Sequence, residues 1–457
     1  MQYMISIDVG TTNLKMSLFT QDFQPLDGFH YGYKEVQMDD VKYELNLNEI
    51  LQAIREGLIY FIEHHPIKYL ELFITTAMHS IQLLNHDMSF FGNTLTWADR
   101  RGAELIQNRS KKQLETQYLT TGTPYHSMNP FYKLLSMKES LSNFKIGSIK
   151  DLIYYYLTDQ WTIDVASASS SGLYSLKEHT WDNSVLNELH LSSKQLPIIE
   201  NPRYSAKLTL NLAVNLAEAV VYIGTSDGVS SNYAFAGLEN AAVLSIGTSH
   251  AVRIVSQVPK VNPLKQNFCY QIDAKDYLVG YPSNNGANVL QWISEIFNID
   301  LEAMDAIIKK RPSIQGVFFP FINGERSPIW NDFIQANLSD LHRGANRESI
   351  IYSLVCGMLF NIRHNVDLLK EDIAFDKLGV VGGAMRLFGL RQLVADVLNL
   401  PIYIPQMSQA ETLGTINLVK SIQIETDFDV IKPNLGQVAI LDFAYSNYRV
   451  KLQRYLS

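Results

Sequence analysis

The chain has 457 residues, of which 46% are hydrophobic and 18% charged, and its formal net charge is −8. That length is too great for one ordinary core and predicts two domains, which we expect at residues 1–240 and 241–457. The acidic balance, without clustered Lys or Arg, argues against nucleic acid or a membrane surface as a partner. No signal-peptide pattern or long apolar stretch occurs, and the two cysteines lack metal-ligand spacing. We therefore expect a cytoplasmic protein.

Residues 4–19, MISIDVGTTNLKMSLF, predict a β-hairpin, because two apolar runs flank a Gly-Thr-Thr turn. The backbone N–H groups and hydroxyls of such a turn form a concavity that donates to phosphate oxygens without a lysine. Asp8 stands inside the first strand, where a charge is costly unless it is paired or lies close to a metal. Mg²⁺ prefers oxygen ligands and bridges nucleotide phosphates, so Asp8 is the candidate magnesium ligand.

Two later segments predict strands with polar tips. Residues 74–84, ITTAMHSIQLL, are typical of a strand that dips at Met78 and His79, and residues 93–102, NTLTWADRRG, of a strand that ends at Trp97. An indole offers a flat apolar face to a carbon skeleton, while His, Asp and Arg side chains bind hydroxyl groups. The tips predict a pocket for a polyhydroxylated small molecule, although a single histidine such as His79 is more often structural.

Residues 219–223, AVVYI, predict a buried strand, and the following GTSDG predicts a turn into a helix. Asp227 then lies near a helix N-terminus, where the helix dipole favours an ionised carboxylate. The carboxyl end of a strand beside a helix start is also where doubly wound α/β folds carry their chemistry. From the local residues alone, a catalytic carboxylate and a simple capping residue fit equally well.

Residues 243–255, VLSIGTSHAVRIV, repeat the pattern of the first hairpin. Gly247 and Thr248 correspond to Gly10 and Thr11, while a serine replaces the aspartate of the first copy. Two copies of one donor-rich turn favour a phosphate cradle over a simple turn. Neither copy contains the GxxxxGK[ST] or GxGxxG pattern of other nucleotide-binding loops.

Residues 380–398, VVGGAMRLFGLRQLVADVL, predict a strand, a Gly-Gly turn and an amphipathic helix. A helix that begins directly after a glycine turn presents backbone N–H groups to an anion. This segment is therefore suited to nucleotide contact, although a Gly-Gly turn alone is a weak signal.

These pieces, in this order and spacing, resemble the FGGY carbohydrate kinases. The resemblance runs from IDVGTTNLK to about residue 420 and includes AMHS, TWADRR, TGTPYHSMNPFYKL, IGTSDG, SIGTS, NNGANVLQW, FPFINGERSP, GGAMRLFGLRQLVAD and AETLGT. It implies an α/β fold of two ribonuclease-H-like domains, as in actin-like ATPases, with ATP and a sugar bound in the cleft between them. It also implies ATP and Mg²⁺ as cofactors, and a closing motion that excludes water.

Matched position by position, the resemblance implies a role for each candidate residue. Asp227 resembles the family's catalytic base, which also contacts the sugar, and Asp8 resembles its Mg²⁺-associated carboxylate. The other matches are Gly10, Thr11, Thr12, Asn13, Gly247, Thr248, Gln291, Gly382, Gly383 and Ala384 for the nucleotide, and Met78, His79 and Trp97 for the sugar. The sequence departs from the family at Cys356, where Glu is usual, and at Leu387, where some members have Asn. Both departures concern the nucleotide site rather than the catalytic centre.

The AMHS and TWADRR segments, with TPYHSMNP at residues 123–130, look most like the gluconate kinases of the family. A xylulose kinase is the alternative, and glycerol is disfavoured because residues typical of glycerol kinases are missing. The carboxylate of gluconate needs a cationic or N–H partner. Arg100, Arg101, His126 and Lys133 are the candidates.

An actin-like ATPase that drives assembly or chaperoning is the alternative of another class, because the phosphate hairpins alone fit both. The polar and aromatic residues between positions 76 and 133 favour the kinase. We therefore expect a small-molecule sugar or sugar acid as the partner, without nucleic acid or membrane, and we leave a homodimer open.

Overall fold

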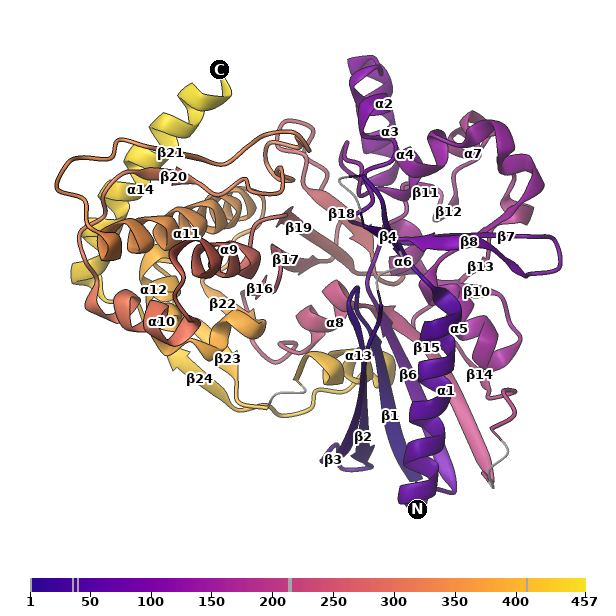
Figure 1. Ribbon diagram of the computed structural model, residues 1–457. Coiled ribbons are helices and arrows are strands. Elements are labelled where there is room, and N and C mark those ends of the chain that lie inside the picture. Colours follow the sequence, from indigo (N-terminus) through magenta and orange to yellow (C-terminus); the bar gives the residue numbers. More distant parts are fainter. Residues whose placement is uncertain (1, 35–36, 39–40, 213–215, 408–409) are drawn as a thin grey trace. The chain divides into compact units, whose positions relative to one another are not determined.

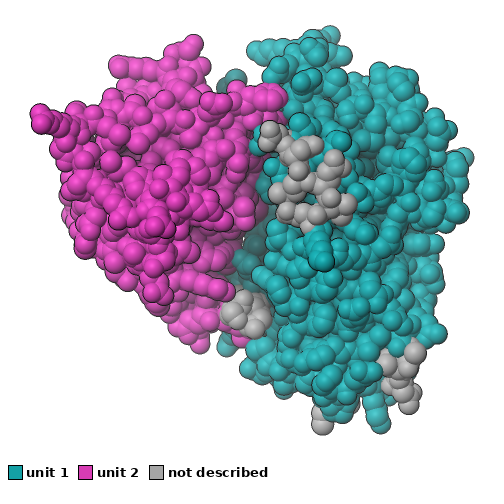
Figure 2. Space-filling model, viewed as in Figure 1, with its two compact units in different colours: residues 1–236, 255–279, 409–425 teal, residues 237–254, 280–408, 426–457 magenta. Residues whose placement is uncertain are grey.

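The computed structural model describes residues 2–34, 37–38, 41–212, 216–407 and 410–457. The chain forms two compact units, each assembled from segments that are separated in the sequence (Figure 2). Unit 1 comprises residues 1–236, 255–279 and 409–425, and unit 2 comprises residues 237–254, 280–408 and 426–457. The domain boundary at residue 240 stays a prediction, and two segments that follow it in the sequence group with unit 1.

A six-stranded sheet forms the centre of unit 1, in the order β14-β15-β6-β1-β2-β3 (Figure 1). Its strands are β1 (Gln2–Val9), β2 (Asn13–Thr20), β3 (Pro25–Gly32), β6 (Tyr69–Thr76), β14 (Ser205–Lys207) and β15 (Glu218–Ser226). β1 is antiparallel to β2 and parallel to β6, and β15 is parallel to β6. The carboxyl ends of β1, β6 and β15 therefore lie at one edge of the sheet.

Helices cover both faces of this sheet (Figure 1). α1 (Leu47–His64) and α5 (Ile149–Thr158) lie on one face, and α8 (Asp227–Tyr233) and α13 (Ala410–Lys420) lie on the other. The apolar stripe of α1, with Ile50, Ile54, Leu58 and Phe61, is buried in the main core of the unit. The helix is thus held mainly by tertiary packing, and it fixes the sheet that carries the candidate residues.

A second, five-stranded sheet of unit 1 has the order β4-β5-β8-β7-β9. Its strands are β4 (Gln37–Met38), β5 (Tyr43–Leu45), β7 (Ile81–Leu84), β8 (Phe90–Leu95) and β9 (Lys145–Gly147). Residues 74–84, expected as one dipping strand, are the end of β6 and the whole of β7, which belong to different sheets. Met78 and His79 consequently lie in the loop between the two sheets.

Shorter elements complete unit 1. They are α2 (Ala103–Gln107), α3 (Lys111–Thr121), α4 (Pro130–Leu135), α6 (Val165–Ser169), α7 (Asn183–Glu188), β10 (Thr162–Asp164), β11 (Tyr174–Ser175), β12 (Thr180–Trp181), β13 (Ile198–Glu200), β18 (Phe268–Gln271) and the 3₁₀ turns Lys138–Asn143 and Ser193–Gln195. A second core of buried side chains, which includes Phe131, Leu134, Leu141 and Trp181, holds many of them together.

Unit 2 is built on the strand order β17-β16-β22-β23-β24. The strands of this unit are β16 (Ala241–Ile246), β17 (His250–Ser256), β20 (Val317–Phe319), β21 (Asn337–Ser339), β22 (Lys377–Val381), β23 (Ile402–Pro405) and β24 (Phe428–Ile431), and β19 (Tyr277–Ser283) leads the chain into it from unit 1. The helices are α9 (Ala287–Phe297), α10 (Leu301–Lys310), α11 (Arg347–Asp372), α12 (Phe388–Leu398) and α14 (Leu435–Leu456), with a 3₁₀ turn at Gly383–Arg386. β16 is antiparallel to β17 and parallel to β22, so β16 and β22 also end at one edge.

The structure confirms both predicted hairpins as antiparallel strand pairs, β1 with β2 and β16 with β17. It also confirms a strand followed by a helix at β15 and α8, and the strand, turn and helix at β22 and α12. None of the helices in the described part of the chain combines the length and apolar character that a membrane span requires.

Candidate active site

The candidate residues of unit 1 gather at the edge where its three parallel strands end. Asp8 is the next-to-last residue of β1, Asp227 directly follows β15, and Met78 and His79 lie just beyond β6. Because the carboxyl ends of parallel strands meet at one edge, residues far apart in the sequence become neighbours there. Asp8 and Asp227 are close enough to interact electrostatically.

Asp8 lies in an acidic and partly buried environment. The pKa of its carboxyl group is raised to about 7, first by loss of hydration on burial and then by the negative charges of Asp227 and Glu411. Lys15, which is paired with Asp8 across the hairpin, opposes this shift. A nearby cation would stabilise the ionised form of Asp8, which its surroundings disfavour. The residues therefore fit a divalent ion.

The same acids do not form a complete cage for a metal. Among the described residues there is no group of three or more His, Cys, Asp or Glu side chains that could hold a metal ion. Mg²⁺ usually keeps several waters and binds through one or two carboxylates together with substrate phosphates. An ion held by Asp8 would therefore need phosphate oxygens or water to complete its coordination.

The turn of the first hairpin is a tight loop that carries an exposed threonine. The Gly10 N–H donates to the carbonyl oxygen of Asn13 at 2.9 Å, which closes the turn, and Thr12 is exposed. The indole Nε1–H of Trp97, just beyond β8, donates to Oγ1 of Thr11 at 2.9 Å. Because this oxygen accepts from the indole, the hydroxyl hydrogen of Thr11 points elsewhere and is suited to a phosphate oxygen.

His79 has an unusual backbone and a fixed ring. Its φ is +66°, a left-handed conformation that is uncommon for a residue other than glycine and recurs at functional sites. The ring Nδ1–H donates to the carbonyl oxygen of Ser170 at 2.9 Å, and the ring forms a T-shaped contact with Tyr270. Met78 packs against a small apolar core that includes Tyr270. The predicted sugar residues are therefore held in place by the structure.

Asp227 is the first residue of α8, as the sequence predicted, and its side chain is exposed. Its Oδ1 accepts a hydrogen bond from the N–H of Gly228 at 2.7 Å. The helix behind it is buried: Gly228, Val229 and Ser230 have little contact with solvent. An accessible carboxylate on a rigid support is what a general base requires.

The helix that carries Asp227 is fixed by α13, which is contributed by a distant part of the chain. A side chain at Gly414 would collide with the carbonyl oxygen of Ser230, so the two helices approach backbone to backbone. The hydroxyl of Thr415 links Thr75 on β6 (2.6 Å) with Ser230 (2.9 Å). The first turn of α13 also supplies Glu411, whose charge acts on Asp8. The AETLGT segment contributes to the family resemblance, but its residues alone predict no role in the site.

In unit 2 the turn of the second hairpin lies against two other turns of the backbone. Gly382 has φ +109°, and a side chain there would collide with the carbonyl group of Ile246. A Cβ atom on Gly286 would lie 2.7 Å from the carbonyl oxygen of Gly247. The N–H of Ala287, at the start of α9, donates to that same oxygen at 2.7 Å. Glycine is required for these approaches, which join the predicted phosphate turn to the Gly-Gly turn.

The other nucleotide candidates of unit 2 lie at the same turns or on α9. Thr248 and Gly383 are exposed, whereas Ala384 is buried in the 3₁₀ turn. Gln291 is exposed on α9, and its amide donates to the carboxylate of Glu295 at 3.0 Å. Their role towards a nucleotide stays a prediction.

The second hairpin is also held by a histidine that sequence reasoning did not identify. Nδ1–H of His250 donates to the carbonyl oxygen of Asn285 at 2.7 Å, and Nε2 accepts from the side-chain amide of Asn365 at 3.1 Å. Nε2 can accept only when it carries no proton, so the two bonds together require a neutral ring. Burial lowers the pKa of His250 to about 3, which keeps the ring neutral. No local pattern distinguishes this residue from a surface histidine beside a turn.

Two of the candidate partners for a substrate carboxylate already have partners within the protein. The guanidinium of Arg101 binds Asp99 and Glu44 at 2.7 Å each. The ammonium of Lys133 is fully buried and donates to two backbone carbonyl groups at 2.7 Å. We therefore set both aside as partners of a substrate.

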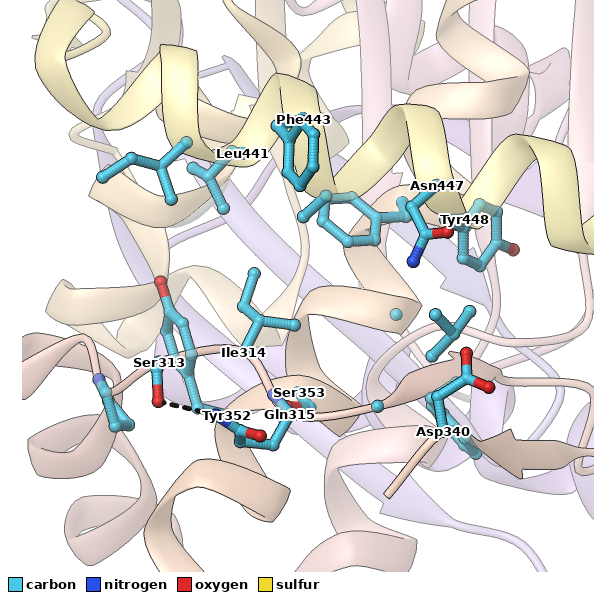
Figure 3. Close-up of a pocket in the computed structure, with 18 of the residues that line it drawn as sticks. Ser313, Ile314, Gln315, Asp340, Tyr352, Ser353, Leu441, Phe443, Asn447 and Tyr448 are labelled. Carbon is cyan, nitrogen blue, oxygen red and sulfur yellow. Dashed lines mark hydrogen bonds between the residues drawn. The ribbon is translucent and has the colours of Figure 1, made fainter. Parts of the chain in front are cut away.

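A cavity of about 1160 Å³ in unit 2 is separate from all of these residues. Figure 3 shows it between α14, which contributes Phe443 and Asn447, and the irregular segment Ser313–Gln315. The side-chain amide of Gln315 donates to the hydroxyl of Ser313 at 3.1 Å. None of the predicted site residues lines this cavity, so we assign it no part in the site.

Comparison with known families gives two matches that cover most of the chain. Residues 3–233 match the N-terminal domain of the FGGY family of carbohydrate kinases, and residues 242–419 match its C-terminal domain. The gluconokinase of Bacillus subtilis (strain 168) is 28% identical to this chain, over 95% of this chain and 90% of that protein.

Two solved structures superpose on nearly all of the molecule. A ligand-bound xylulose kinase from Lactobacillus acidophilus gives a TM-score of 0.94 and a gluconate kinase from the same species gives 0.93. Each is 26% identical and covers 100% of this chain and 98% of its own. The matches confirm the predicted fold class, an α/β protein with two domains of the actin-like ATPase type. One structure is a xylulose kinase and the other a gluconate kinase, so overall structural similarity does not distinguish between xylulose and gluconate.

Proposed function

The chain belongs to the FGGY family of carbohydrate kinases, and we propose that it phosphorylates gluconate with ATP. The γ-phosphoryl group would be joined to the 6-hydroxyl of gluconate, with release of ADP and a proton. The observation that carries this choice is the similarity to a gluconokinase over 95% of this chain and 90% of that protein. The AMHS segment at residues 77–80 and the TWADRR segment at residues 96–101 support the same substrate.

Phosphoryl transfer depends on positioning and charge neutralisation more than on covalent chemistry. In this proposal the turn at residues 10–13 donates N–H and hydroxyl groups to phosphate oxygens, and Thr248 does so near the γ-phosphate. Asp227 accepts the proton of the attacking hydroxyl. Strong basicity is not needed, because that proton leaves late in a loose transition state.

Asp8 is the proposed ligand of Mg²⁺, either directly or through water. When bound, the ion neutralises charge on the nucleotide phosphates. The acidic surroundings of Asp8 support this role, because the negative charges of Asp227 and Glu411 disfavour its ionised form, and the opposing effect of the exposed Lys15 is smaller. The requirement for Mg²⁺ is part of the proposal.

Two other functions remain as alternatives. A xylulose kinase is one, because the solved xylulose kinase superposes as well as the gluconate kinase does, with TM-scores of 0.94 and 0.93. An actin-like ATPase without sugar kinase activity would use the same two hairpins. The positions of Met78 and His79 beside the strand end that carries Asp227 support a substrate site and so favour a kinase.

The test is a coupled assay of ADP release with Mg·ATP and, in turn, gluconate, xylulose, ribulose, glycerol, fuculose and rhamnulose. A site built for gluconate holds a protein group that binds the substrate carboxylate. When a neutral ketose binds instead, that protein group is buried without a partner. We therefore expect kcat/KM for gluconate to exceed that for xylulose by about 10²-fold or more. Product analysis should find the phosphate on the terminal hydroxyl.

Each other outcome selects an alternative. Turnover of xylulose without a response to gluconate would make the chain a xylulose kinase. ADP release that is independent of every sugar would identify an ATPase of the other class. The Asp227→Ala variant serves as the control that the measured activity belongs to this chain and not to a contaminant.

A further inference from the structure

The strand that leads to Asp227 contains a bulge. β15 pairs with β6 in regular register up to Tyr222, opposite Phe73, and resumes with Thr225 opposite Thr75. Gly224 within the bulge has φ +66°, and a side chain there would collide with the carbonyl oxygen of Ile74. A bulge next to an active site changes the direction in which the strand end presents its residues.

A buried lysine occupies this irregularity. Lys150, in the first turn of α5, is 2% exposed, and its Nζ donates to the carbonyl oxygens of Ile74 (2.6 Å) and Thr225 (3.0 Å). Ile74 lies opposite the bulge and Thr225 ends it, so the ammonium joins β6 to β15 where the strand register is interrupted.

Burying the ammonium group of Lys150 costs free energy, so filling space does not explain why a lysine stands here. Burial lowers the pKa of Lys150 to about 8, and the negative charge of Asp164 opposes that shift. A methionine or leucine would fill the same space without the loss of hydration. An apolar side chain cannot link two carbonyl groups on adjacent strands, whereas a hydrogen-bond donor can.

The two linked carbonyl groups lie close to the candidate catalytic residues. Thr225 is two residues before Asp227, and Ile74 is five residues before His79. On the proposed function, Asp227 must meet a substrate hydroxyl within hydrogen-bonding distance. A shift of 1 Å in such a group, caused by a change elsewhere, can cost about 10²-fold in rate.

We propose that Lys150 is a positioning residue, whose ammonium group ties Ile74 to Thr225 across the bulge and thereby fixes the carboxylate of Asp227 for proton acceptance. The inference rests on the proposed role of Asp227 as the base. It assigns Lys150 no contact with substrate or nucleotide.

The test compares Lys150→Met, Asp227→Ala and the double variant. Lys150→Met should lower kcat by about 10- to 100-fold. It should leave KM for ATP within about twofold, because the phosphate turn belongs to the β1–β2 hairpin, whereas the two carbonyl groups that Lys150 links lie on β6 and β15. If Lys150 acts through Asp227, the double variant should be no slower than Asp227→Ala alone.

Lys133→Met is the matched control. Lys133 is another fully buried lysine that donates to two backbone carbonyl groups, but those groups lie in the loop before α4 and not on β6 or β15. Whatever loss this variant causes should multiply with that of Asp227→Ala, since the two act independently. Circular dichroism and thermal unfolding check that each variant is folded. If Lys150→Met is not folded, Lys150→Gln takes its place, because its amide still reaches one carbonyl.

Three results would overturn the inference. The losses of Lys150→Met and Asp227→Ala could multiply, Lys150→Met could raise KM for ATP as strongly as it lowers kcat, or its kcat could equal that of the wild type. Near-normal turnover of Asp227→Ala alone would instead overturn the proposed base, so failure of the proposed function is distinguishable from failure of this inference.

Discussion

The indole of Trp97 and the hydroxyl of Thr11 connect the predicted sugar residues to the predicted phosphate turn. Their hydrogen bond, 2.9 Å long, fixes the direction in which the Thr11 hydroxyl can donate. We expect Trp97→Phe and Thr11→Val each to lower kcat/KM for ATP by about three- to tenfold, the range of one hydrogen bond. The double variant should lose no more than the more damaging single change. Steady-state kinetics at saturating sugar measures all three.

Thr12 provides the control for this cycle. Its hydroxyl accepts from the side-chain amide of Asn13 at 3.1 Å, whereas the indole of Trp97 donates to Thr11. Thr12→Val should therefore combine multiplicatively with Trp97→Phe. If Thr11→Val also combined multiplicatively with it, the indole and the phosphate turn would be energetically independent.

Single residues differed in how much the sequence revealed. Asp8 could be singled out as a candidate site residue because a charge inside an apolar strand has few structural explanations. Glu411 could not, because its proximity to Asp8 arises only when α13 packs on the sheet. Lys150 gave no signal either: within its helix it resembles a surface lysine, and its burial depends on a bulge centred at Gly224.

The elements that position the site were predictable where one local pattern decided them. Both hairpins follow from a glycine turn between apolar runs, and the start of α8 follows from a turn after a buried strand. The split of residues 74–84 into β6 and β7 was not predictable, because strand-forming residues stand on both sides of Met78 and His79 and a dip within one strand gives the same pattern. Only tertiary pairing with β1 on one side and β8 on the other separates the two strands.

α11 carries a histidine whose titration should be visible in the acid stability of the protein. His364 is 8% exposed, burial lowers its pKa to about 3, and its Nδ1 lacks a hydrogen-bond partner among the described residues. In the unfolded chain a histidine takes up its proton near pH 6.5. The stabilisation from a neutral His364 is therefore complete above pH 6.5 and is lost as the pH falls towards 3.

We expect His364→Gln to weaken the loss of stability between pH 7 and pH 5. Removing one such histidine should reduce that loss by about 2 kcal/mol, the free energy of a 1.5-unit pH interval. Urea unfolding at the two pH values measures the change, and His30→Gln, at an exposed position, is the control that should leave it unaltered. An identical decline in wild type and His364→Gln would show that His364 is already protonated in the native state.

At the scale of the whole molecule, unit 1 is completed by chain that lies far along the sequence. Residues 255–279 and 409–425 belong to it, although both follow the first segment of unit 2. The N–H of Cys269 donates to the carbonyl oxygen of Gly122 at 2.9 Å, and the α13 hydroxyl of Thr415 links β6 to α8. The family matches end and restart between residues 233 and 242, and they do not reveal this exchange of segments.

The division of the chain at residue 240 is therefore expected not to yield an independent folding unit. A fragment of residues 1–240 lacks α13, so the face of the sheet that α13 covers and the helix that carries Asp227 would be exposed to water. We expect this fragment to bind a hydrophobic dye and to unfold in urea without a cooperative transition, whereas the full chain unfolds cooperatively. Adding residues 241–457 as a second chain should restore the cooperative transition, because the missing segments are then supplied in trans. If the fragment of residues 1–240 unfolded cooperatively at the urea midpoint of the full chain, the later segments would not be needed for a complete core.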